Sequence, residues 1–189
     1  MERNAVRARL HPDRVAVVGA TDREGSIGRA VLTNLDSFDG DVVPVNPSRD
    51  EVLGYPCVPS LEQAGPVDLA GVVVPPGAVL DVVREAGEAG VDAVVVITAG
   101  FGEAGSEGAA RERELAAVAA EYGIALVGPN SLGVMSTPAD LNATFGPESP
   151  LPGSMSFMSQ SGAFVTAALD WATDQGLGFR HVVSLGNEA

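Results

Sequence analysis

The segment that decides the fold is residues 15–28, VAVVGATDREGSIG. Its first four residues are apolar and predict a buried strand, which runs directly into a glycine-rich loop. Apolar residues at 27, 31 and 35 then predict a helix. Glycines in such a loop let the backbone turn tightly and approach a pyrophosphate, whose charge is met by N–H groups at the helix N-terminus. A glycine-rich loop alone is weak evidence, but its place between strand and helix favours a nucleotide site over a plain turn.

The same alternation of strand and helix continues as far as Val127. Short β-branched runs predict strands at 15–18, 42–45, 69–74, 93–98 and 125–127. Helical spacing recurs between them at 79–86 and 115–122, with a weaker candidate at 60–64. Such βαβ units build parallel sheets. We therefore expect an α/β fold, a Rossmann-like parallel sheet with helices on both faces.

Turn-forming residues divide the chain. Four prolines and two glycines fall in residues 138–153, which we interpret as a linker between a nucleotide-binding domain, 1–137, and residues 154–189. The last segment predicts a strand at 155–158, a helix at 162–172 that places Phe164 and Trp171 in the core, and a strand at 181–184. One helix and two strands cannot bury a core alone. We expect the start of a second α/β domain of a longer protein.

Composition excludes several classes of function. The formal net charge is -14, and all eleven cationic residues are arginine. Such a surface repels nucleic acid and fits a protein that works in concentrated salt, where the Debye length falls to ~3 Å at 1 M. No apolar run resembles a signal peptide or a membrane span, and a single cysteine, Cys57, suits a reducing compartment. These features predict a cytoplasmic protein without membrane partners, and no His/Cys pair has metal-ligand spacing.

The end of the second strand bears on which nucleotide binds. NAD sites place a carboxylate there to accept a hydrogen bond from the ribose 2′-OH. Here the chain reads Val45-Asn46-Pro47-Ser48-Arg49, so the nearest charged group is an arginine. An arginine can bind the ribose phosphate of NADP or the phosphates of coenzyme A (CoA), and spacing leaves both open.

Six blocks of sequence, in order, resemble one family. They are Gly19–Gly28 with 45–47, 54–56 through 67–70, Val74-Pro75, 97–105 (ITAGFGEAG), 128–133 (GPNSLG) and 159–163 (SQSGA). Together they are similar to the CoA-binding domain shared by ADP-forming acetyl-CoA synthetases and the succinyl-CoA synthetase α subunit, over residues 10–189. The forms Gly-Phe-x-Glu-x-Gly and Ser-Gln-Ser-Gly favour the single-chain or α-subunit ADP-forming acetate–CoA ligases. The resemblance also implies that the second domain is flavodoxin-like and similar to that of succinyl-CoA synthetase.

The resemblance implies a set of binding residues. The residues at the CoA site would be Gly19, Thr21, Gly25, Ser26, Ile27, Gly28, Arg49, Val74, Pro75, Ile97, Thr98 and Asn130. A helix start at Ser159, Gln160, Ser161 and Gly162 would face a phosphorylated histidine. Ser131 stands where the family often has cysteine, so no role of a sulfur carries over. The role of Glu103 stays open between a solvated loop carboxylate and a functional group.

The implied reaction is acyl-CoA + ADP + phosphate ⇌ acid + CoA + ATP. The resemblance places its phosphohistidine beyond Ala189, so no catalytic residue is expected here, His11 and His181 included. ADP or ATP with Mg would be bound by parts outside this chain, an ATP-grasp domain or a β subunit, in an oligomeric whole. Two alternatives stay open: a regulatory module that senses CoA or acyl-CoA in a synthetase-like protein acetyltransferase, and an NADP-dependent protein.

Overall fold

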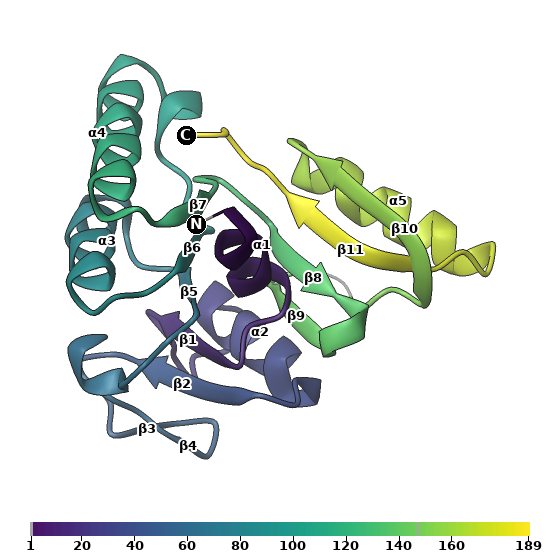
Figure 1. Cartoon of the computed structure of the whole chain (residues 1–189), viewed down its shortest axis with the longest axis horizontal. Helices are drawn as coiled ribbons and strands as arrows, with labels where there is room; N and C mark the ends of the chain where they lie inside the picture. Colours follow the sequence, from purple (N-terminus) through teal and green to yellow (C-terminus); the bar gives the residue numbers. More distant parts are fainter. Residues whose placement is uncertain (1, 147) are drawn as a thin grey trace.

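A five-stranded parallel sheet forms the centre of the computed structural model, which describes residues 2–146 and 148–189. Its strands are β1 (Arg14–Val18), β2 (Asp41–Val45), β5 (Leu69–Val72), β6 (Ala93–Val96) and β7 (Ala125–Val127). Their order is β2-β1-β5-β6-β7, and every neighbouring pair is parallel (Figure 1). The order therefore reverses at β1, and ligands of such sheets bind at this switch point, outside the carboxyl ends of the strands. The predicted α/β fold is confirmed.

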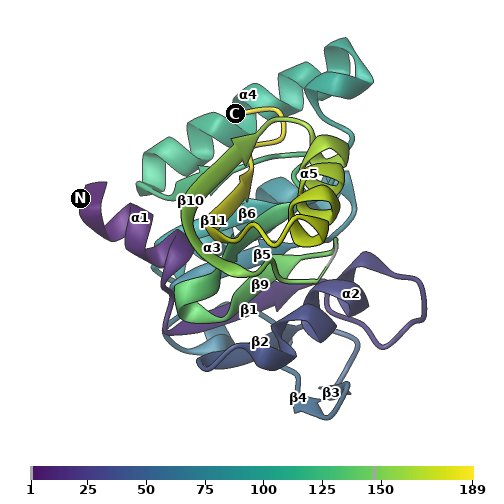
Figure 2. The same cartoon turned by 90° about the vertical axis from the view of Figure 1, so that its right-hand side faces the viewer.

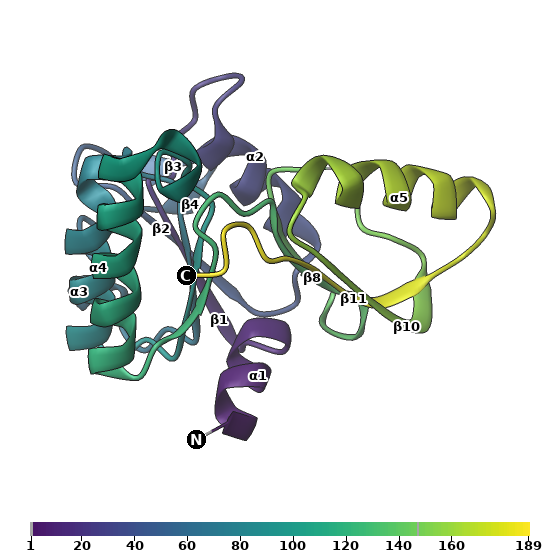
Figure 3. The ribbon, with the colours of Figure 1, turned by 90° about the horizontal axis from the view of Figure 1, so that it is seen from above.

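Helices cover both faces of this sheet. These helices are α1 (Glu2–Leu10), α2 (Ile27–Asn34), α3 (Val79–Glu88) and α4 (Ser106–Tyr122), whereas α5 (Gly162–Asp174) packs elsewhere, on a second sheet. Figure 3 shows α3 and α4 together on one face, where their apolar residues join one buried cluster with alternate strand residues such as Ala16 and Val94. Helix α2 packs against the strand residues that face the opposite side of the sheet, which include Val15 and Val95. Residues facing opposite sides thus alternate along each strand.

Short elements complete the first sheet's surroundings. They are η1 (Leu35–Ser37), β3 (Glu51–Val52), β4 (Tyr55–Pro56), η2 (Glu62–Ala64), η3 (Pro76–Ala78), η4 (Gly102–Ala104) and η5 (Thr137–Ala139). The helix expected at 60–64 is only the 3-10 turn η2. The third and fourth strands end two residues earlier than expected, at 72 and 96. For β5, the ladder stops where its neighbour β1 ends at Val18, since Gly19 turns the chain away with φ +92°.

Residues 138–153, which the sequence predicts to be a linker, contain regular secondary structure. Strand β9 (Leu141–Thr144) lies within this segment, is buried throughout and pairs with β8 (Gly133–Ser136) in an antiparallel hairpin. The two strands extend a second sheet of order β10-β11-β8-β9, with β10 (Pro152–Ser159) parallel to β11 (Phe179–Ser184). Residues 1 and 147, within the expected first domain and linker, lie outside the described residues. The division into domains stays a prediction.

The hairpin also supplies the core that residues 154–189 lack. Leu132 and Met135 pack with Val165 and Leu169 of α5 and with Val182 of β11 in one buried cluster. The placement of Phe164 and Trp171 in that core is wrong, since 59% and 61% of their surfaces are exposed. Figure 2 shows this second sheet facing the viewer with α5 beside it.

Among the described residues, every helix is too short or too polar to cross a membrane.

Candidate nucleotide site at the switch point

The glycine-rich loop connects β1 to α2 as the sequence predicts. Gly19 donates its N–H to the carbonyl of Val45, 2.9 Å away, and its φ of +92° suits glycine. Gly28 lies in the first turn of α2, where a Cβ would overlap the carbonyl oxygen of Gly19. Only glycine therefore lets α2 begin this close to the loop.

Ser26 begins the helix. Its side-chain oxygen accepts the N–H of Arg29 at 3.3 Å and its hydroxyl donates to the carbonyl of Arg23 at 2.6 Å. This N-cap leaves the other N–H groups of the first turn, together with the positive end of the helix dipole, for a bound anion. The helix predicted after the glycine-rich loop is confirmed, and anion binding at its N-terminus stays a prediction.

Asn46 takes a structural part at the tip of β2. Its amide donates to the carbonyl of Ala20 at 2.8 Å, and its side-chain oxygen accepts the N–H of Ser48 at 2.9 Å. Asn46 stands where NAD sites carry a carboxylate, and here its side chain ties the glycine-rich loop to the loop after β2. This geometry disfavours the 2′-OH recognition typical of NAD sites.

Two cavities open on this loop and together hold most of the predicted residues. The α2 cavity, about 470 Å³, is lined by Gly19, Thr21, Gly25, Ser26, Ile27, Gly28, Val74, Pro75, Ile97 and Thr98, among others. The β2 cavity, about 760 Å³, shares Gly19, Thr21, Val74 and Pro75 with the first and adds Asn46 and Arg49. The two cavities therefore adjoin along the carboxyl ends of β1, β2, β5 and β6, and we refer to them together as the groove.

Arginines gather around the groove although the protein is strongly acidic. Arg23 lines both cavities, Arg49 lines the β2 cavity, and Arg29 donates to the carbonyl of Asp22 at 2.6 Å. Arg49 is paired with the Asp22 carboxylate at 3.1 Å. Three of the eleven arginines therefore stand at one loop, which makes this edge of the sheet attractive to phosphate.

Family profiles match nearly the whole chain. The family described as "CoA binding domain" matches residues 13–137, and the family described as "Succinyl-CoA ligase like flavodoxin domain" matches residues 152–189. The chain belongs to the CoA-binding domain family. The resemblance inferred from six sequence blocks is confirmed.

Relatives of this CoA-binding domain are longer proteins. It is 51% identical over 181 residues to Acetate--CoA ligase [ADP-forming] I of Archaeoglobus fulgidus, covering 95% of this chain and 26% of that protein. It is 41% identical over 194 residues to the α subunit of Acetate--CoA ligase [ADP-forming] I of Pyrococcus furiosus, covering 98% and 42%. A solved structure of Ca. Korarchaeum cryptofilum dinucleotide forming acetyl-coenzyme A synthetase 1, in complex with phosphate and ADP, matches with a TM-score of 0.93 and 41% identity, covering 98% and 40%. The chain thus spans well under half the length of these relatives.

Asn130 lies apart from the other predicted residues of the CoA-binding domain. It is not among the described residues that line the two cavities. Its side-chain amide instead donates to Asn187 at 3.2 Å, and its N–H donates to the carbonyl of Thr98 at 3.0 Å. The Thr98 hydroxyl in turn donates to the carbonyl of Val74 at 2.7 Å. Asn130 therefore contacts the groove through the backbone of Thr98.

Asn187, which sequence reasoning missed, lies after the last strand of the second sheet and contacts the segment that follows β6. Its side-chain amide donates to Glu103 and to Glu112, each at 2.6 Å. Glu103 also accepts the N–H groups of Gly100 and Phe101. Burial raises the pKa of Glu103, but these hydrogen bonds lower it by more, so the pKa lies below its usual value. Glu103 thus holds the loop after β6.

We expect Glu103→Ala to lower the melting temperature at pH 7 by roughly 2–4 °C, because the backbone N–H groups of Gly100 and Phe101 lose a charged acceptor worth about 1 kcal/mol. A carboxylate whose folded pKa is depressed stabilises the fold above its unfolded pKa and loses that effect as pH falls through the folded pKa. The difference from wild type should therefore shrink below the ordinary value of 4.5. Glu121→Ala, on the exposed end of α4, is the control that should show no loss. An equal loss in both variants would contradict the role of Glu103.

The residues expected to face a phosphohistidine lie at the N-terminus of α5. Ser161 is the N-cap and accepts the N–H of Phe164 at 3.2 Å, while the Ser159 side-chain oxygen accepts the N–H of Ser161 at 3.1 Å. Gln160 donates to Glu188 at 2.7 Å. Gly162 begins the helix with room around its Cα, since a Cβ would come no closer than 3.4 Å to Leu132. Capping thus explains both serines, and the structure brings all four residues to one helix end.

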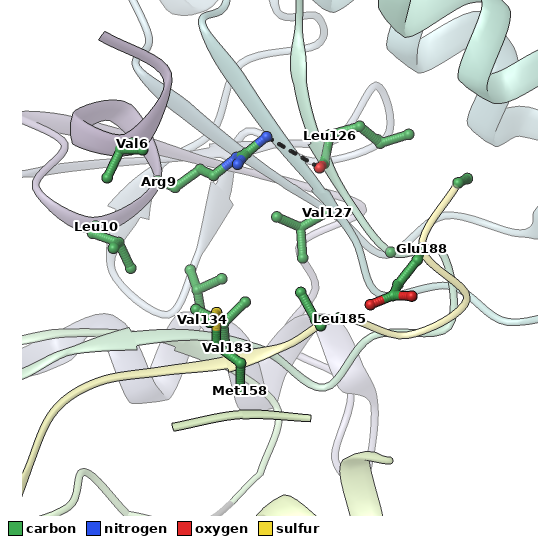
Figure 4. Close-up of a pocket in the computed structure, with 12 residues that line it drawn as sticks. Val6, Arg9, Leu10, Leu126, Val127, Val134, Met158, Val183, Leu185 and Glu188 are labelled. Atoms are coloured by element: carbon green, nitrogen blue, oxygen red, sulfur yellow. Dashed lines mark hydrogen bonds between the residues drawn. The ribbon is translucent and has the colours of Figure 1, made fainter. Parts of the chain in front are cut away.

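A further pocket of the chain, about 390 Å³, lies between α1, β7 and the second sheet (Figure 4). Its walls are mainly apolar, as at Val127, Val134 and Val183. Arg9 lies at one side and donates to the carbonyls of Ala125 and Leu126 at 3.4 and 3.3 Å, and burial lowers its pKa. The sequence-predicted site residues are not among the described residues around it. This pocket therefore lies apart from the predicted site.

The remaining reactive side chains lie outside the groove. The rings of His11 and His181 meet edge to face with centroids 5.6 Å apart, and burial followed by the charges of His11 and Arg180 lowers the pKa of His181. Burial also raises the pKa of Cys57, a free and half-buried thiol. Ser131 is buried, donates to the carbonyl of Ser184 at 2.5 Å and accepts the N–H of Gly133 at 3.0 Å. No group of three His, Cys, Asp or Glu residues suited to a metal occurs among residues 2–146 and 148–189.

Proposed function

We propose that this chain is the CoA-binding part of an ADP-forming acyl-CoA synthetase. The whole enzyme would interconvert acyl-CoA, ADP and phosphate with a carboxylic acid, CoA and ATP. The observation that carries the proposal is the groove at the switch point, where a helix N-terminus and arginines meet between apolar walls. The named activity of the acetate–CoA ligases, which are similar over nearly all of this chain, supports it.

The groove residues fit the parts of CoA. Glycine at 19 and 28 brings the backbone close to a diphosphate, and Thr21, Gly25, Ser26 and Ile27 form its cradle at the start of α2. Arg49 and Arg23 supply positive charge for phosphate groups in the β2 cavity. The rim formed by Val74 and Pro75, with Ile97 and Thr98 of the adjacent strand end beside them, suits the pantetheine arm. When bound there, CoA supplies the thiol that accepts the acyl group.

The N-terminus of α5 is the second part of the proposal. We place it opposite a phosphorylated histidine carried by another part of the whole enzyme, because its free N–H groups and dipole favour an anion. The solved relative that contains phosphate and ADP supports phosphoryl chemistry in the family. In this proposal the described chain positions anions and CoA, and it holds no catalytic residue of its own.

Further parts of the proposal concern what lies around this chain. ADP or ATP with Mg would be bound by an ATP-grasp domain or a β subunit, and the naming of an α subunit among the relatives supports a separate partner in some of them. Asn130 would help shape the groove from beneath. We place the enzyme in the cytoplasm, in concentrated salt and as an oligomer. The reduced Cys57 and the net charge of -14 support the first two.

CoA is expected to stabilise this chain, and NAD and NADP are not. At a CoA concentration one hundredfold above the Kd, mass action adds about 2.7 kcal/mol, or roughly 5–11 °C in melting temperature. The measurement is a thermal melt with each nucleotide in turn. A shift with NADP and none with CoA would overturn the proposal.

A further inference from the structure

Asp22 places a carboxylate inside an anion-binding loop. It lines the β2 cavity, and its side-chain oxygens lie 3.1 and 3.3 Å from one guanidinium nitrogen of Arg49. About half of each side chain is exposed, so the ion pair sits at the mouth of the cavity rather than in the core. Asp22 is thus paired with Arg49, a cation that would otherwise be free to meet a ligand in the β2 cavity.

The carboxylate is not needed to shape the loop. Gly19 is held by Val45, Ala20 is held by Asn46, and Ser26 bonds to Arg23. Arg29 binds Asp22 through its backbone carbonyl, which a change of side chain leaves in place. The Asp22 side chain is therefore committed to Arg49 alone among the hydrogen bonds of the described residues.

We propose that Asp22 is an internal competitor for Arg49 and so sets the affinity of the groove for phosphate. In the free protein the carboxylate holds the guanidinium. A ligand phosphate, with more charge and more acceptor oxygens than a carboxylate, displaces it. Each binding event then breaks one ion pair. This cost weakens binding relative to a loop with a neutral residue at this position.

This inference rests on the proposed CoA site and concerns how tightly that site binds. The expected size of the effect follows from the exposure of the ion pair, because breaking one exposed ion pair changes an equilibrium constant by about two- to fivefold. Asp22→Asn keeps the size of the side chain and removes its charge. It should therefore lower the Kd for CoA about two- to fivefold at an ionic strength near 0.1 M, where screening is weak at contact distances.

The test is calorimetric titration of CoA into four variants and the wild type. Glu24→Gln is the matched control, since Glu24 is an exposed carboxylate of the same loop and is not among the described residues lining either cavity. It removes the same charge and should leave the Kd within about 1.5-fold. Asp22→Asn in an Arg49→Ala background should change the Kd of the single Arg49→Ala variant by less than about 1.5-fold, because the contested cation is gone.

The proposal stands if Asp22→Asn alone binds more tightly and the gain disappears without Arg49. It is overturned if Asp22→Asn binds CoA with the affinity of Glu24→Gln or more weakly. It is also overturned if the gain persists in the Arg49→Ala background. Absence of CoA binding by the wild type would instead reject the proposed function, on which the inference rests, so the two failures can be told apart.

Discussion

Gly28→Ala is expected to destabilise the fold by roughly 1–3 kcal/mol, the cost of overpacking a close contact, and to weaken CoA binding at least about tenfold. The added methyl group would overlap the carbonyl oxygen of Gly19, which is backbone and cannot rotate away. Alanine gains about 1 kcal/mol of helix propensity over glycine, so the contact must cost more than this for the net effect to be a loss. The start of α2 would move away from the loop, and its N–H groups would no longer point toward the bound phosphates.

Chemical denaturation and CoA titration measure the two effects of this change. Gly77→Ala is the control for stability, because a Cβ at position 77 meets nothing within 4 Å and the backbone there is not left-handed. It should leave the free energy of unfolding unchanged or raise it by about 0.4–1 kcal/mol, because alanine lowers the conformational entropy of the unfolded chain. If Gly28→Ala were as stable as this control and bound CoA normally, the close packing of α2 on the loop would have no part in the site.

The first sheet could be predicted because its signals are local. Runs such as Val94–Ile97 are buried on both faces and therefore continuously apolar, and helices α3 and α4 show helical spacing between them. The loop at 19–28 was predictable for the same reason, since its glycines, its cap at Ser26 and its strand and helix are adjacent in sequence. Local signals of this kind do not depend on which distant segments meet.

The second sheet could not be predicted because its partners are distant. Strand β9 is four residues long and lies among prolines, so composition indicates a linker, yet burial against α2 and β8 makes it a strand. Helix α1 has charged residues along a short segment and no strong apolar period. Phe164 and Trp171 have apolar side chains on a helix, but the face they share is not the one that meets Leu132 and Val182. Apolar character alone does not say which face is covered.

The site shows the same division between local and distant signals. The cradle residues follow from one loop, whereas the tie from Asn46 to Ala20 and the pair of Asp22 with Arg49 join segments more than twenty residues apart. Asn187 contacts Glu103 and Glu112 from the other sheet. Only the parallel order of β2 and β1 brings the first two pairs together, and only the docking of the second sheet brings the third.

Arg49→Ala is expected to weaken CoA binding by about 1.5–3 kcal/mol, or roughly 10- to 150-fold, the range for a hydrogen bond to a charged group. The side chain lines the β2 cavity, and its removal takes away a guanidinium that would meet a ligand phosphate there. If Arg49 contacts the 3′-phosphate of CoA, dephospho-CoA lacks the partner, and its affinity should fall much less in the variant. Titration of both ligands into both proteins measures the coupling between residue and phosphate. Arg84→Ala, on the exposed face of α3, removes the same charge away from the groove and should leave both affinities unchanged. Equal CoA affinity of Arg49→Ala and wild type would exclude a contact between Arg49 and the ligand, whereas equal losses for the two ligands would move the contact from the 3′-phosphate to the diphosphate.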